Sequence, residues 1–194
     1  MRYLAFVSAL ALLAGCGQAP NTTASTTTTT EQAAPVGPPM QAQITLAEFV
    51  EKAATSDLFE VEAGRLAAQR TRTAAIRDFA NMMVRDHTAT SERLKTILAS
   101  TPAAPTPPAA LDAAHQQKLT DLRNATPDRF DEIYLDQQTE AHENAATLLR
   151  DYAARGDTPA VSQFASETLA KVQAHLDTVR ELDRGGVDEA KEKT

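Results

Sequence analysis

The sequence predicts an all-α protein whose folded domain is built from four long helices. Aromatic residues make up only 5% of the chain, which is too few for a typical sheet protein, while alanine and leucine are abundant. Four segments of roughly 23 to 29 residues carry apolar side chains at helical spacing and contain no internal proline. Helices of this length can enclose a common core.

The first residues are typical of a bacterial lipoprotein leader. Arg2 precedes an apolar run over residues 4–13, which is too short to span a bilayer but has the length of a secretory h-region. The run ends in Leu13-Ala14-Gly15-Cys16, which resembles a lipobox. That resemblance implies a signal peptide over residues 1–15 and lipid attached to Cys16. An ordinary signal peptide with an incidental cysteine is the alternative.

Residues 16–43 predict a disordered tether that follows the lipidated cysteine. Between residues 17 and 40 the chain holds seven threonines and four prolines and almost no large apolar side chain, so it cannot bury enough surface to fold. Gly17 stands where the lipoprotein resemblance implies that aspartate would prevent export to the outer membrane. The expected location is therefore the periplasmic side of a bacterial envelope, with an anchor in the outer membrane.

The helices are expected to form a domain over residues 44–184, followed by a disordered charged tail over residues 185–194. Their expected bounds are about 45–69, 73–99, 109–124, 127–155 and 159–183. Thr45 and Glu48 form a capping-box pattern at the first start. Thr126-Pro127 and Thr158-Pro159 place a capping hydroxyl before a proline at the first helical position. Gly156 and the Gly185-Gly186 pair are the expected stops.

An internal repeat predicts how these helices are connected. Residues 68–80 align without gaps on residues 153–165, with six of thirteen positions identical. Both segments cover a helix end, a turn and the next helix start, which indicates one helical hairpin used twice. The proline-rich segment and the short helix then form a long crossover. Hairpin, crossover and hairpin in this order predict a four-helix ferritin-like bundle.

Several ionisable residues fall on the predicted core faces. Asp57 and Glu60 lie within the apolar stripe of the first helix, and His87 and His175 lie near the centres of theirs. His142 lies at the flank of its stripe, but the repeat makes it equivalent to Asp57 and so turns it inward. At 1.5 Å per residue these positions share a height near the middle of the bundle. We therefore expect the side chains to converge.

Buried charges are costly unless they are paired or bind a metal, so two explanations account for such a convergence. One is a polar network that fixes the register of the helices. The other is a divalent transition metal bound by Glu60, His87, His142 and His175, with Asp57 and Asp86 as candidates to orient the ligands. If the side chains are instead partly exposed, they need share no role. No Glu-x-x-His motif precedes any of these histidines, so a di-iron centre is not expected.

Other function classes are excluded by composition and motifs. A net charge of −7 disfavours nucleic-acid binding, and a single cysteine excludes a disulfide framework. The chain contains no P-loop, no dinucleotide-binding glycine motif and no Gly-x-Ser-x-Gly elbow, so we do not expect an enzyme. The sequence identifies no protein partner and no oligomeric state.

The folded segment resembles a bacterial family of domains of unknown function, family 4142. The resemblance rests on the motifs Glu60-x-x-x-Gly64-Arg65-Leu66-Ala67, Phe79-Ala80-x-x-Met83-Val84-x-Asp86-His87, Phe130-Asp131-x-x-Tyr134 and His175-Leu176. It implies a ferritin-like fold and export, often with a lipid anchor, but no settled activity. The expected function is binding, an envelope-stress role or a structural role at the membrane, with metal binding as the alternative.

Overall fold

The computed structural model describes the backbone of residues 43–192 and the side chains of residues 43–185. The predicted leader, Cys16 and nearly all of the predicted tether lie outside the described residues. The helices are α1 (Leu46–Arg70), α2 (Ala74–Ala99), α3 (Ala113–Asn124), α4 (Pro127–Arg155) and α5 (Pro159–Glu192). The described chain contains no strand, which confirms the all-α prediction.

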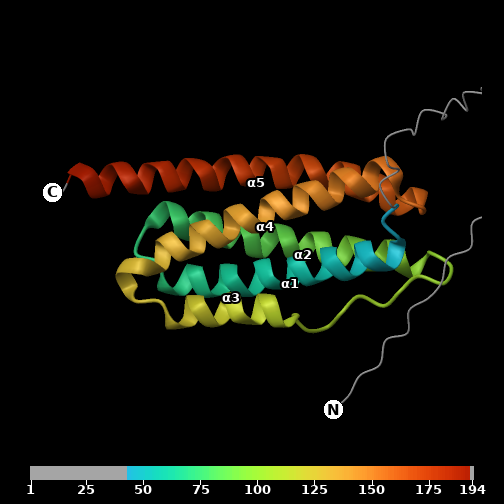
Figure 1. The fold of residues 1–194 in the computed structure, drawn as a ribbon, viewed down its shortest axis with the longest axis horizontal. Helices are drawn as coiled ribbons and strands as arrows, with labels where there is room; N and C mark the ends of the chain where they lie inside the picture. Colours follow the sequence, from blue (N-terminus) through green and yellow to red (C-terminus); the bar gives the residue numbers. More distant parts are fainter. Residues whose placement is uncertain (1–42, 193–194) are drawn as a thin grey trace, which may run out of the picture. The chain divides into compact units, whose positions relative to one another are not determined.

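The four long helices surround one interior (Figure 1). Helices α1 and α2 form one hairpin, and α4 and α5 form another. Helix α1 also packs against α4, and α2 packs against α5, so each long helix has two neighbours. Helix α3 belongs to the long connection between α2 and α4 and packs on the outside of α1 and α4. No helix within residues 43–192 is long and apolar enough to cross a membrane.

The helix starts follow the predicted capping signals in part. The Thr45 hydroxyl accepts a hydrogen bond from the Glu48 amide, and the Glu48 carboxylate accepts one from the Thr45 amide, so the predicted capping box forms. The Thr126 hydroxyl makes no capping hydrogen bond, so this prediction was wrong, although Pro127 opens α4 as expected. Helix α3 begins at Ala113 rather than 109, because Asp112 caps it by accepting from the amide of His115.

The predicted stop at Gly185-Gly186 was wrong, because α5 continues to Glu192. Gly156 ends α4 as predicted, in an extended conformation with a φ of −62°, whereas Gly185 and Gly186 remain within the helix. In helical conformation a glycine costs only about 1 kcal/mol relative to alanine. Residues 187–194, after the pair, contain two glutamates, two lysines and one alanine, which favour the helix.

Helix α3 is tied to the bundle by the last residue of α1. The Arg70 guanidinium donates hydrogen bonds of 2.6 to 2.8 Å to the carbonyl oxygens of Leu122, Arg123 and Ala125. These carbonyls end α3 or follow it and have few helical partners of their own. The same guanidinium lies 4.6 Å from the centroid of the Phe130 ring, at the start of α4. One side chain therefore links α1, α3 and α4.

The interior is divided into two apolar clusters along the bundle. One contains Phe59, Met83, Tyr134 and Leu176 among its members. The other contains Phe49, Leu94, Tyr152, Phe164 and Val172. Burial of each such side chain contributes on the order of 1.5–3 kcal/mol. Each of the four long helices contributes residues to both clusters, with the boundary between the clusters near the middle of the helix. The buried residues Asp57, His87, His142 and His175 lie near this boundary.

Gly64 allows α1 and α2 to approach closely, as an alanine side chain there would lie 2.9 Å from the carbonyl oxygen of Ala80 and 3.0 Å from Val84 Cγ2. We expect Gly64→Ala to lower the free energy of unfolding by about 1–2 kcal/mol, since the clash outweighs the helix preference of alanine. Gly185→Ala is the matched control, because nothing lies within 4 Å of that position. It should stabilise by up to about 1 kcal/mol. Urea unfolding measures the change in the free energy of unfolding for both variants. Changes of the same sign would contradict the close approach of α1 and α2 at Gly64.

Candidate metal centre

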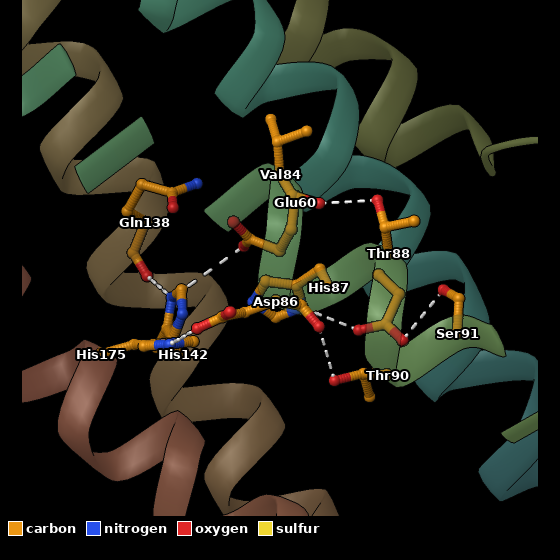
Figure 2. Close-up of polar contacts among 11 residues, drawn as sticks. Glu60, Val84, Asp86, His87, Thr88, Thr90, Ser91, Gln138, His142 and His175 are labelled. Atoms are coloured by element: carbon orange, nitrogen blue, oxygen red, sulfur yellow. Dashed lines mark hydrogen bonds and ion pairs between the residues drawn. The ribbon is translucent and has the colours of Figure 1, made fainter. Parts of the chain in front are cut away.

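Three histidines from three helices meet between the two apolar clusters: His87 on α2, His142 on α4 and His175 on α5. Their exposed fractions are 5%, 1% and 4%. The ring centroids lie 5.5 to 5.7 Å apart, and one ring nitrogen from each residue lies within 4.8 Å of the other two. Figure 2 shows the side chains gathered at one point between the helices. We call these three residues the tri-histidine cluster.

Two of the three rings are hydrogen-bonded to aspartates. His87 Nδ1 lies 2.7 Å from Asp57 Oδ1, and His175 Nε2 lies 3.0 Å from Asp86 Oδ2. The second oxygen of Asp57 accepts a hydrogen bond of 3.1 Å from the Ser91 hydroxyl. Because an ionised carboxylate only accepts, each of these ring nitrogens carries the hydrogen of the bond. The contacts fix the orientation of both rings (Figure 2).

The third ring is held by its own helix. His142 Nδ1 donates to the carbonyl oxygen of Gln138 at 2.8 Å, one turn earlier in α4. In each histidine, therefore, one ring nitrogen is hydrogen-bonded to a protein oxygen and the other is not. The remaining atoms, His87 Nε2, His142 Nε2 and His175 Nδ1, are buried and have no hydrogen-bond partner. An unpaired buried nitrogen on each of three neighbouring rings is unusual for a folded interior.

The electrostatics favour neutral rings at two of the three positions. Burial, together with the charge of His87, lowers the pKa of His142 to about 3. Burial and the charge of His87 also lower the pKa of His175. At His87 burial lowers the pKa, but the hydrogen bond and charge of Asp57 outweigh it and the pKa is raised. At neutral pH His142 and His175 therefore each have a free lone pair, while His87 is the ring of the three that takes up a proton most readily.

Glu60 lies on the other side of His142. Its carboxylate is 1% exposed, and Oε1 is 4.0 Å from His142 Nδ1, the nitrogen that already donates to Gln138. Both carboxylate oxygens lack a hydrogen-bond partner. Burial raises the pKa of Glu60 to about 7, against the opposing charge of His87. Within the described residues the group placed to share an ion contains the three histidines and not Glu60. That Glu60 binds a metal stays a prediction.

All six residues predicted from the core faces or the metal hypothesis lie in this region of the fold. They are Asp57, Glu60, Asp86, His87, His142 and His175. Ser91 and Gln138 were not predicted from the sequence. Ser91 is four residues after His87 and shares its helix face, so helical spacing could have indicated it. The Gln138 contact uses a backbone carbonyl, which any residue supplies, so no sequence signal exists for it.

The donor set fits a metal ion. Three imidazole nitrogens suit zinc, copper, iron or nickel. A tetrahedral ion with bonds of about 2.0–2.1 Å separates its ligands by about 3.4 Å, so the rings need to draw together by little more than about 1 Å. A cavity of about 30 Å³ borders His87 and Asp57 and is large enough for a water molecule. Hydrogen bonds to the outer ring nitrogens are typical of metal-binding histidines.

Fold and cluster together define an all-helical protein with a buried tri-histidine centre. The chain belongs to the family described as a domain of unknown function, DUF4142, whose model matches residues 28–182. This confirms the family predicted from the sequence motifs. A comparison with curated proteins finds no significant match.

Solved structures of similar fold come from CopM. CopM in the Cu(II)-bound form gives a TM-score of 0.64 at 16% identity, over 74% of this chain and 99% of that one. CopM in the Ag-bound form gives 0.62 at 18% identity, over 74% and 98%. CopM in the Cu(I)-bound form gives 0.62 at 17% identity over the same shares. At this identity the likeness establishes a shared fold.

Proposed function

We propose that the protein binds a divalent late transition metal ion at the tri-histidine cluster, with copper the preferred ion. The observation that carries this proposal is the meeting of three buried histidines, each of which has one ring nitrogen without a protein partner. A buried polar atom left unpaired costs about 1–3 kcal/mol, and one ion satisfies all three at once. Copper(II) stands highest among divalent ions in affinity for such ligands, and the structures of CopM hold copper or silver.

A purely structural network explains the cluster less well. Such a network stabilises a fold when each buried polar atom has a partner. Here only the outer nitrogens are paired, with Asp57, Asp86 and the Gln138 carbonyl. The other three nitrogens, His87 Nε2, His142 Nε2 and His175 Nδ1, have no hydrogen-bond partner. The arrangement instead matches a set of ligands whose orientations are fixed in advance.

The charges at the site also favour a divalent ion. The cluster supplies neutral imidazoles, and Asp57 and Asp86 supply two negative charges directly behind two of them. These charges offset the two positive charges of the ion, which makes burial of the ion less costly. An imidazole must be neutral to bind, and the hydrogen bond and charge of Asp57 help to raise the pKa of His87, so protons compete with the metal at this ring.

The test is a titration of the full chain, without a tag, carrying Cys16→Ser. This change removes the only thiol of the chain, so bound copper reports on the histidines. We expect about one Cu(II), Zn(II) or Ni(II) per chain, with an affinity that falls as the pH is lowered, because protons compete for the imidazoles. Fewer than about 0.1 ion per chain for every metal would contradict the proposal and leave a structural or envelope-stress role.

We further propose that the domain is a ferritin-like bundle held at the periplasmic face of the outer membrane by lipid on Cys16. The lipobox-like sequence and the thiol at its end support this location. Several acyl chains at about 0.8 kcal/mol per buried methylene form a stable anchor. We expect wild-type protein in the membrane fraction and Cys16→Ser in the soluble periplasmic fraction. Equal membrane recovery of both would show that Cys16 is not the anchor.

A further inference from the structure

The two aspartates behind the cluster have different surroundings from the acidic residues at the surface. Among the ion pairs of the described residues, Asp57 contacts only His87 and Asp86 contacts only His175. By contrast, Glu143 and Glu167 pair with arginines at exposed positions. No lysine or arginine neutralises either aspartate at close range within this part of the chain. Their charge is therefore available to whatever the two rings bind.

We propose that Asp57 and Asp86 make the cluster selective for divalent over monovalent ions; this inference rests on the proposed function. Each aspartate accepts from the nitrogen opposite the one left free, so each charge acts on the ion through an imidazole. His142 differs, because its outer nitrogen donates to a neutral carbonyl. The site thus places two negative charges behind three ligands.

The physical reason is the dependence of the Coulomb energy on charge. A fixed negative charge attracts a divalent ion with twice the energy of a monovalent one at the same distance. Burial strengthens this attraction, since Asp57 is only 6% exposed and the histidines are 5% exposed or less. Both oxygens of Asp57 are engaged, by His87 and by Ser91, so its position is fixed.

The experiment compares Zn(II) and Ag(I), which do not change oxidation state, in competition titrations of the Cys16→Ser chain. Asparagine in place of Asp57 or Asp86 keeps an oxygen that accepts from the ring but removes the charge. Each change should lower the Zn(II) affinity by about 10–100-fold and the Ag(I) affinity by about 3–10-fold. The ratio of the two affinities then falls about 3–10-fold per substitution and further in the double variant.

A copper reduction potential gives a second readout. Loss of one negative charge should raise the potential of bound copper by about 30–60 mV, since a tenfold change in the ratio of the Cu(II) and Cu(I) affinities corresponds to about 59 mV. A purely structural effect of Asp57 or Asp86 would weaken both oxidation states alike. Asp86 is the safer position to change, because 28% of its side chain is exposed.

Asp112→Asn is the matched control. Asp112 makes the same kind of contact, 2.8 Å from its Oδ1 to His115 Nδ1, but on α3 outside the cluster. Asparagine also serves as a helix cap, so α3 should remain intact. If the ratio of the Zn(II) and Ag(I) affinities were unchanged in both Asp57→Asn and Asp86→Asn, the selectivity proposal would be overturned. The proposed metal-binding function would not be affected by that result. A Cys16→Ser chain that has both aspartates and binds neither ion would overturn the proposed function and this inference with it.

Discussion

His142→Ala should lower the affinity for Cu(II) and Zn(II) by more than about 100-fold, because loss of a ligand exceeds the 10–100-fold cost of losing an outer partner. Burial and the charge of His87 hold the pKa of His142 at about 3, so its ring is ready to bind without losing a proton. Without it only two imidazoles remain at the cluster. Calorimetric titration measures the loss, and circular dichroism checks that the helices are retained.

The chain offers a matched control, because it contains four histidines and only one of them lies outside the cluster. That residue, His115, lies on α3 and pairs with Asp112. His115→Ala should keep the wild-type affinity and stoichiometry. A His142→Ala chain that binds copper as tightly as His115→Ala would place the site elsewhere. Restoration of binding to His142→Ala by added imidazole would support the assignment further.

The second large effect concerns Glu60 and the stability of the metal-free protein. Burial raises the pKa of Glu60 from 4.5 to about 7, so the folded state keeps a proton that the unfolded state releases above pH 4.5. The unfolded state then binds fewer protons, and stability falls as pH rises through the interval between the two pKa values. Above about pH 7 the full cost of about 3 kcal/mol is present.

Glu60→Gln removes this cost, because glutamine is neutral in both states and has nearly the same shape. We expect its gain in the free energy of unfolding to be about 2–3 kcal/mol larger at pH 8 than at pH 5. Guanidinium unfolding in the presence of a chelator measures both values. Glu62→Gln, at an exposed position of the same helix, should change stability by less than about 0.5 kcal/mol at either pH. A pH-independent effect of Glu60→Gln would refute the buried carboxyl as its cause.

The sequence was sufficient to predict most helix bounds. Helix α4 covers the predicted residues 127–155, and α1 and α2 begin within one residue of the expected starts. Proline and the capping box are local signals, so they can be read without knowledge of the fold. The prediction failed at Gly185-Gly186, where a glycine pair can either end a helix or continue it. The choice depends on the backbone conformation, which composition does not fix.

The candidate site could be predicted only in part. Helical periodicity predicted that Asp57, Glu60, His87 and His175 face inward, and all four are buried. For His142 periodicity alone indicated the flank, and the internal repeat was needed to turn it inward. No sequence pattern could separate Glu60 from the three histidines, because all four residues face inward and only the positions of their side-chain atoms exclude Glu60 from the group that could share an ion.

The sequence by itself determined the helices, their inward faces and the height at which the polar residues lie, because these follow from the rise and turn of a single helix. The tertiary structure alone decided which ring nitrogens pair with aspartate or carbonyl oxygens and which remain free. That outcome depends on the rotation of each helix against its neighbours and on side-chain rotamers, where a difference of about 1 Å separates a hydrogen bond from an unpaired atom. Such distances are fixed only when all four long helices pack together.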